Sequence, residues 1–103
     1  MGSVAAQTMV FGELAVYPNG DSWNSKNERI QLNAYDAGGA ITVLNDASKE
    51  AVLLGSDDNG SGSVRVRNKT GESIATMHAD EYGNGVVGAW NRKGKGRTLK
   101  PGP

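Results

Sequence analysis

The sequence predicts an all-β protein built from tandem hairpins, and three observations predict it. A pattern recurs every 23 residues and aligns Gly39, Gly62 and Gly85. The segments after these glycines alternate apolar and polar side chains, with the period of a half-buried strand. No window of useful length has helical periodicity, because glycine or asparagine interrupts each candidate. We therefore expect short strands and turns along the whole chain.

The repeat divides one domain, residues 1–103, into four units, since 103 residues make a domain of ordinary size. An irregular first unit covers residues 12–38. Two regular units cover residues 39–61 and 62–84, and a truncated unit covers residues 85–103. The regular unit reads G-x-V-x-V-x-N-x-x-G-x-x-I-x-x-L-x-x-D-x-x-G-x-G.

Each unit is expected to hold two strands. The first strand is predicted at residues 40–44, 63–67 and 86–90, where apolar side chains occupy every second position. The second strand is predicted at residues 51–55 and 73–79, where the alternation is less regular. In the irregular unit the corresponding apolar positions are Leu14, Val16, Ile30 and Leu32.

The connections predict hairpins. Residues 68–71 (Asn-Lys-Thr-Gly) place asparagine at the start of a type I turn and glycine at the left-handed position after it, and residues 91–94 repeat this pattern. Residues 57–62 and 80–85 are expected to form a longer glycine-rich turn. Two hairpin turns per unit favour an antiparallel meander. A β-prism or a β-solenoid with one coil per 23 residues is the alternative.

A sheet with an apolar face and no helix to cover it must bury that face in another way. Either the sheet folds onto itself, or copies of the chain cover one another. We expect an obligate homo-oligomer, with a closed trimer as the first choice and a stacked filament as the alternative. The residues predicted to form the assembly core are Ile41, Val43, Val52, Leu54, Val64, Val66, Ile74, Met77 and Val87.

The two ends of such a sheet are expected to be free edges. Residues 10–17 and 97–99 would expose unpaired backbone groups that invite strand addition. Pro101 and Pro103 are expected to blunt the C-terminal edge, because proline lacks the N–H donor. The N-terminal edge has no such guard, so we expect residues 4–16 to pair with a neighbouring chain.

The composition offers little for catalysis. The chain has no cysteine and a single histidine, so a cysteine- or histidine-rich metal cluster is excluded within one chain. Asp57, Asp58, Asp80 and Glu81 are weak candidates for calcium ligands, but we expect them to be turn residues that cap backbone groups. We therefore expect no enzymatic activity, no catalytic residue and no cofactor.

The charges balance, with 11 basic and 11 acidic residues, which argues against a nucleic-acid partner. Residues 92–100 carry five basic side chains and no acidic one. We expect this segment to be solvated or to pair with acidic turns of a neighbouring copy. No run approaches the roughly 18 apolar residues of a membrane-spanning helix, and residues 1–14 lack the pattern of a signal peptide.

Residues 62–85 read GSVRVRNKTGESIATMHADEYGNG. This segment resembles uncharacterised bacterial proteins with tandem copies of a V-x-N-x-x-G-K-x-V-x-x-L-x-x-D-x-x-G-x-G unit. Residues 90–101 also resemble the C-terminal end of those proteins, so the resemblance covers about residues 39–101. It implies a surface-anchored or extracellular stalk and therefore an extracellular or cell-surface location. It assigns no catalytic residue.

The function expected from the sequence is that of a non-catalytic, self-associating β-repeat protein in a bacterial surface or extracellular fibre. The alternative is a carbohydrate- or ligand-binding module that uses a flat sheet face with exposed tyrosine and tryptophan side chains such as Trp90. Its partners would then include cell-surface glycans.

Overall fold

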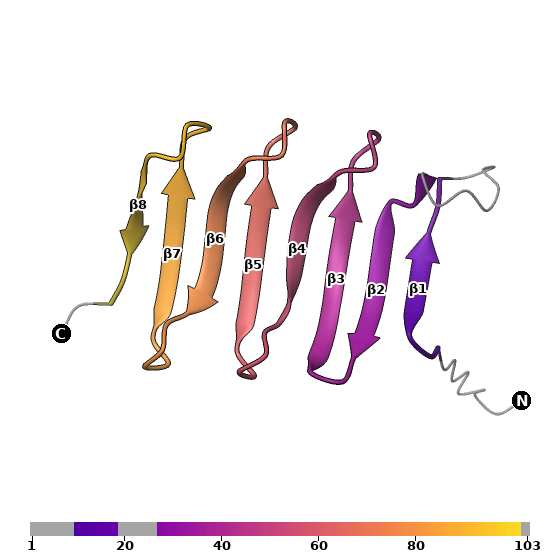
Figure 1. Cartoon of the computed structure of the whole chain (residues 1–103), viewed down its shortest axis with the longest axis horizontal. Coiled ribbons are helices and arrows are strands. Elements are labelled where there is room, and N and C mark those ends of the chain that lie inside the picture. The colour runs from indigo at the N-terminus through magenta and orange to yellow at the C-terminus, as the bar shows by residue number, and fades with distance from the viewer. Residues whose placement is uncertain (1–9, 19–26, 102–103) are drawn as a thin grey trace, which may run out of the picture.

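Eight antiparallel strands form a single sheet in the computed structural model, which describes residues 10–18 and 27–101 (Figure 1). Each strand pairs with the next one along the chain, so the order in the sheet is the order in the sequence. The strands are β1 (Glu13–Val16), β2 (Ile30–Tyr35), β3 (Gly38–Leu44), β4 (Glu50–Ser56), β5 (Gly62–Arg67), β6 (Ser73–Ala79), β7 (Gly85–Trp90) and β8 (Gly96–Leu99).

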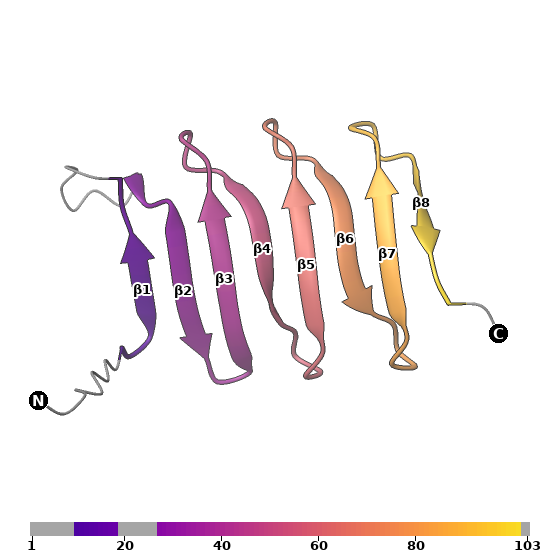
Figure 2. The ribbon, with the colours of Figure 1, turned by 180° about the vertical axis from the view of Figure 1, so that it is seen from behind.

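This arrangement confirms the all-β class and the antiparallel meander. Every neighbouring pair of strands is antiparallel, whereas a solenoid stacks parallel strands, so the solenoid alternative is wrong. The five strands predicted in the regular and truncated units coincide with β3 to β7 to within two residues. The sheet is not closed, and both broad views show β1 and β8 as its two edges (Figures 1 and 2).

Strand β8 ends at Leu99, so Pro101 follows the strand and is not part of it. The effect of Pro101 on strand addition at this edge stays a prediction. Pro103 and residues 4–9 lie outside the described residues.

Five turns between β3 and β8 share one conformation built around an asparagine or aspartate. The side-chain Oδ1 atom of this residue accepts hydrogen bonds of 2.9 to 3.2 Å from the backbone N–H groups two and four residues further on. Its carbonyl accepts the N–H of the third residue further on, and that residue has a φ between 62° and 94°. The five turn-forming residues are Asn45, Asp57, Asn68, Asp80 and Asn91.

These hydrogen bonds correct the expectation of a longer turn at residues 57–62 and 80–85. Both segments form the same three-residue type I turn with a left-handed glycine that the sequence predicts at residues 68–71. The turn-forming residues follow one another at intervals of 12, 11, 12 and 11 positions. The 23-residue period therefore contains two strand-and-turn units, with asparagine turns at one end of the sheet and aspartate turns at the other.

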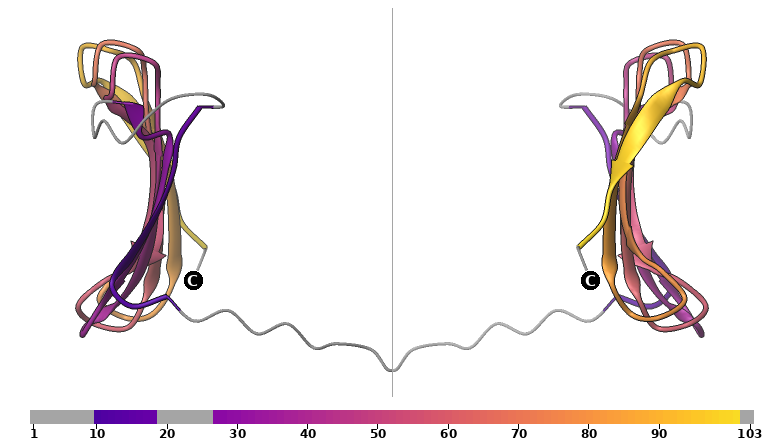
Figure 3. Two further views of the ribbon diagram at one scale, coloured as in Figure 1. Left: turned by 90° about the vertical axis from the view of Figure 1, so that its right-hand side faces the viewer. Right: turned by 90° about the vertical axis from the view of Figure 1, so that its left-hand side faces the viewer.

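The described chain is a single layer without an interior, as the two edge-on views show (Figure 3). Among the described residues, Val86 at 4% exposure is the only buried apolar side chain. The radius of gyration of the Cα atoms is 17.3 Å, against about 13 Å for a compact domain of this length. The accessible surface is 8107 Å², against roughly 5,500 Å² for a compact 10.8 kDa monomer.

We predict that Gly71→Val destabilises the β5–β6 hairpin more than Gly71→Asn does. Gly71 has a φ of 94°, and an added Cβ would meet no atom within 4 Å, so the cost comes from the backbone alone. A β-branched residue in the left-handed region costs about 1–2 kcal/mol, whereas asparagine adopts it more readily. Urea unfolding midpoints of the two variants measure the difference. Equal midpoints would contradict the turn assignment.

Candidate functional site

The dominant feature of the molecule is one broad side of the sheet, which we call the apolar face. Directly paired residues of antiparallel strands point to the same side, so the strand register defines rows that cross the sheet. The central row contains one large apolar residue from every strand, each paired with the next. Its members are Leu14, Leu32, Ile41, Leu54, Val64, Met77, Val87 and Leu99.

Two rows flank the central row on the same face. A second row lies two residues away along each strand. It is apolar from β1 to β7 and ends in a charged residue on β8. Its members are Val16, Ile30, Val43, Val52, Val66, Ala75, Ala89 and Arg97. On the other flank, glycine, alanine and serine pair with one another. These pairs are Ala34–Gly39, Ser56–Gly62 and Ala79–Gly85.

The central row is open to solvent. Leu32 is 36% exposed and Met77 is 51% exposed, and at the edge strand β8 the exposed fraction of Leu99 reaches 72%. A soluble monomer rarely leaves a contiguous apolar patch larger than about 300–600 Å² uncovered. Six strands of about 20 Å and two edge strands of about 13 Å, spaced about 4.8 Å apart, give this face roughly 700 Å². The apolar face is therefore large enough to be an interaction surface.

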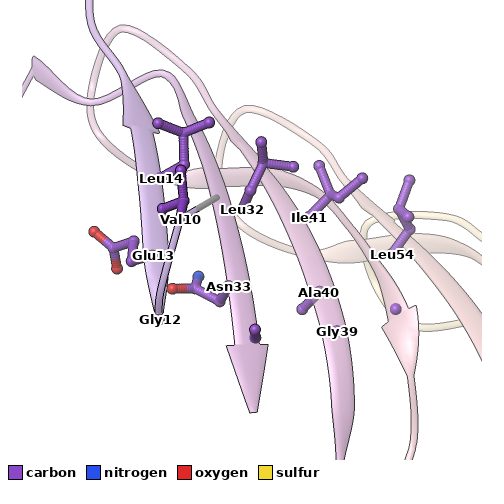
Figure 4. A pocket seen from close by; sticks show the side chains of 12 residues that line it. Val10, Gly12, Glu13, Leu14, Leu32, Asn33, Gly39, Ala40, Ile41 and Leu54 are labelled. Carbon is purple, nitrogen blue, oxygen red and sulfur yellow. The ribbon is translucent and has the colours of Figure 1, made fainter. Parts of the chain in front are cut away.

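The apolar face is hollowed where the small residues lie. Leu14, Leu32, Ile41 and Leu54 stand in a row on one side of the sheet, whereas Glu13 and Asn33 point away from that side (Figure 4). Next to this row is a shallow hollow of about 440 Å³, which reaches the small residues of β2 and β3. A second hollow of about 550 Å³ lies beside the central row between β4 and β7.

The three glycines that define the 23-residue period lie on the small-residue flank. Gly39, Gly62 and Gly85 have no left-handed φ. A Cβ added at Gly39 or Gly62 would come no closer than 3.7 or 4.0 Å to its nearest neighbour, and one at Gly85 would meet nothing within 4 Å. Neither the local backbone nor packing within the described chain therefore requires glycine at these positions.

Eight of the nine residues predicted for the assembly core lie in the two apolar rows. The exception is Ile74, which lies at a register shift between β5 and β6, so Ala75 takes the position opposite Val66. The predicted assembly core did not include any residue of β1, β2 or β8. Their signal was apolar alternation outside the regular repeats, in Leu14, Val16, Ile30, Leu32 and Leu99.

The opposite side of the sheet carries most of the polar side chains. Arg65 is exposed there. Arg67 is paired, since its Nε atom lies 3.1 Å from Glu50 Oε1 and its Nη1 atom donates to the carbonyl of Gly71. The indole ring of Trp90 lies across Gly88 and is half-buried. Trp90 is therefore only partly exposed, whereas Tyr35 and Tyr82 are exposed, and the carbohydrate alternative stays a prediction.

The candidate calcium ligands lie in the turns. Asp57 and Asp80 each use one carboxylate oxygen to accept two backbone N–H groups, as the turn interpretation expects. Asp58 and Glu81 follow them on the exposed side of the same turns. Within residues 10–18 and 27–101, no group of three or more histidine, aspartate or glutamate side chains is arranged to hold a metal ion.

Two further acidic side chains fix the ends of strands. The buried carboxylate of Glu28 accepts hydrogen bonds from the Tyr17 hydroxyl, at 3.0 Å, and from the Gln31 amide, and this acceptor raises the pKa of Tyr17. The Thr70 hydroxyl donates to Glu72 Oε1 at 2.8 Å and lowers the pKa of that carboxyl. Both interactions join residues next to one another in the sheet or its turns.

Comparison with protein-family models, with characterised proteins and with solved structures finds no match for the chain. The part of the chain that the structure describes contains no helix long and apolar enough to cross a bilayer.

Proposed function

We propose that this chain is a non-catalytic structural protein that works by self-association, as a β-repeat element of a bacterial surface or extracellular fibre. The observation that carries the proposal is the open apolar face of a sheet whose described residues bury one apolar side chain, Val86. An exposed apolar face of this size is stable in water when something covers it, because burial contributes about 25 cal/mol per Å² of apolar surface. The covering surface in this proposal is the same face of other copies.

The dimensions of the face support a triangular prism of three copies. Strands β3 to β7 have six or seven residues, which corresponds to about 20 Å. Three such sheets, placed as the sides of a triangle with their strands across the axis, lie about 6 Å from that axis. Packed sheets are about 10 Å apart, so side chains fill about 5 Å from each sheet. The central row of large side chains would fill this space.

The order of the rows also supports the prism. In a triangle the sheets are farthest from one another at the middle of each side and closest at the corners. The largest apolar side chains lie in the middle of the face, and the flank with Gly39, Gly62 and Gly85 lies toward one end of the strands. Glycine within a sheet often marks close approach of another backbone. A neighbouring copy at the corner would explain why glycine recurs where the chain itself leaves room for a side chain.

The area of the face is adequate for a stable interface. Each copy would contribute roughly 700 Å² of flat face, and a standard protein interface buries about 800 Å² per partner. The accessible surface of the chain exceeds that of a compact monomer by more than this amount. The proposed extracellular or cell-surface location rests on the resemblance of residues 39–101 to bacterial stalk proteins alone.

We predict that Val66→Asp abolishes both assembly and folded β-structure, because it places an unpaired carboxylate in the proposed shared core. Ser63→Asp is the matched control, since it adds the same charge to the opposite side of the same strand. Analytical ultracentrifugation and circular dichroism of both variants measure the effect. An unchanged oligomer with unchanged melting in Val66→Asp would contradict the proposal.

A second variant separates assembly from folding within one chain. In the described chain the nearest atom to a Cβ added at Gly62 is 4.0 Å away, and a leucine there would extend into the space that a neighbouring copy would occupy. We predict that it raises the protein concentration needed for half-assembly at least tenfold, whereas Ser63→Leu, on the other side of the sheet, changes it little. Sedimentation at graded concentrations provides the comparison. An equal effect of the two variants would rule out close approach at Gly62.

A further inference from the structure

The two edge strands expose backbone groups that no other described strand pairs with. The hydrogen bond from the Asn91 N–H to the Lys95 carbonyl shows which residue pairs of β7 and β8 are hydrogen-bonded to each other. Bonded pairs recur at every second residue in an antiparallel ladder, so the N–H and C=O groups of Gly96 and Thr98 point away from β7. These groups form the free edge of β8.

The same reasoning applies at the other end of the sheet. The hydrogen bond from the Ala34 N–H to the Gly12 carbonyl shows which residue pairs of β1 and β2 are hydrogen-bonded to each other. The backbone groups of Glu13 and Ala15 therefore point away from β2 and form the free edge of β1.

The direction of the edge strands allows the sheet to continue from copy to copy. Because the number of strands is even, β1 and β8 run in opposite directions, as their arrows show (Figure 1). A second copy in the same orientation therefore presents its β1 antiparallel to β8 of the first copy. The strand order β1 to β8 then repeats without interruption. A head-to-tail contact of this kind generates a filament when it does not close into a ring.

One register between β8 and β1 of the next copy pairs the outward backbone groups, keeps apolar side chains on one face and places opposite charges next to each other. We infer that β8 pairs with β1 of the next copy with Thr98 opposite Ala15 of that copy, which matches the outward backbone groups of both strands. Leu99 then lies opposite Leu14 of the next copy, so the central row of the apolar face continues across the junction.

The same register places Lys100 opposite Glu13 of the next copy. Opposite charges at directly facing positions stabilise a strand pair. Shifting the register by two residues in either direction preserves the faces but removes this charge pair and leaves Leu99 opposite Gly12 or Val16. The outer strand β8 belongs to a hairpin segment, residues 92–100, that carries five basic residues and no acidic one. That charge also favours contact with a neighbour that presents a carboxylate.

This inference rests on the proposed self-association but adds a second interface, at the sheet edges, that is independent of the apolar face. The chain has no cysteine, so any disulfide in a variant with two introduced cysteines must form between the introduced cysteines. In the variant Ala15→Cys/Thr98→Cys both new side chains lie on the polar side, and directly paired residues in a bonded pair have Cα atoms about 5.5 Å apart, within the range of a disulfide. The control is Asn33→Cys/Thr98→Cys, whose first cysteine lies on the same side of the sheet but on β2, one strand away from the junction.

We predict that mild oxidation of the full-length Ala15→Cys/Thr98→Cys protein with diamide gives a ladder of disulfide-linked dimers, trimers and higher multimers on non-reducing denaturing gels. The Asn33→Cys/Thr98→Cys control gives at least tenfold less. Absence of the ladder, or equal ladders in both variants, would overturn the inference. Sedimentation of the same variants under reducing conditions tests the proposed function separately: assembly without cross-linking contradicts the edge register alone, and a folded monomer contradicts the proposed function as well.

A charge exchange gives a second test without cysteine. Lys100→Glu places two carboxylates opposite each other. It is expected to shorten the proposed filaments at least severalfold, with their length measured by electron microscopy. The double variant Glu13→Lys/Lys100→Glu restores an opposite pair and is expected to restore their length. Filaments of equal length in all three proteins would contradict the Lys100–Glu13 pairing.

Discussion

A one-layer sheet cannot bury its own apolar side chains, and the rest of this structure depends on that constraint. Strands β1 to β7 each offer two apolar side chains to the same face and β8 offers one, and the described chain provides no helix or second sheet to cover them. The backbone is well satisfied within the meander, since every strand pairs with the next one. The apolar side chains, in contrast, are not buried within one copy, and they are gathered on the apolar face.

The repeated turns explain how a short recurring sequence pattern produces this surface. Each turn from β3 to β8 is closed by one asparagine or aspartate, whose side chain replaces missing backbone partners, and by one residue with positive φ. Because the turns are alike, each strand enters the sheet in the register that keeps the apolar rows continuous. The repeated glycines Gly39, Gly62 and Gly85 contribute to neither the turns nor the described packing. Their recurrence is therefore explained by the proposed contact between copies rather than by the fold of one copy.

Much of the fold could be predicted from the sequence because period-two alternation and the Asn-x-x-Gly turn both act locally. The prediction missed the identity of the turns at Asp57 and Asp80, because aspartate replaces asparagine and a second glycine follows closely in both places. It also did not show that Ile74 lies outside the two paired apolar rows, because a register shift between paired strands is not visible in one strand alone. The continuity of the central row from Leu14 to Leu99 required the register of all eight strands. No local pattern encodes that long-range information.

The most direct test of this account is the dependence of thermal unfolding on protein concentration. If folding requires shared burial of the apolar face, the folded state is an assembly and its Tm rises with concentration by mass action. We expect circular dichroism melts over a hundredfold range of concentration to show a rise of several degrees, with sedimentation at the upper end giving a multiple of the 10.8 kDa chain mass. A constant Tm, together with the mass of a single folded chain at every concentration, would contradict the account.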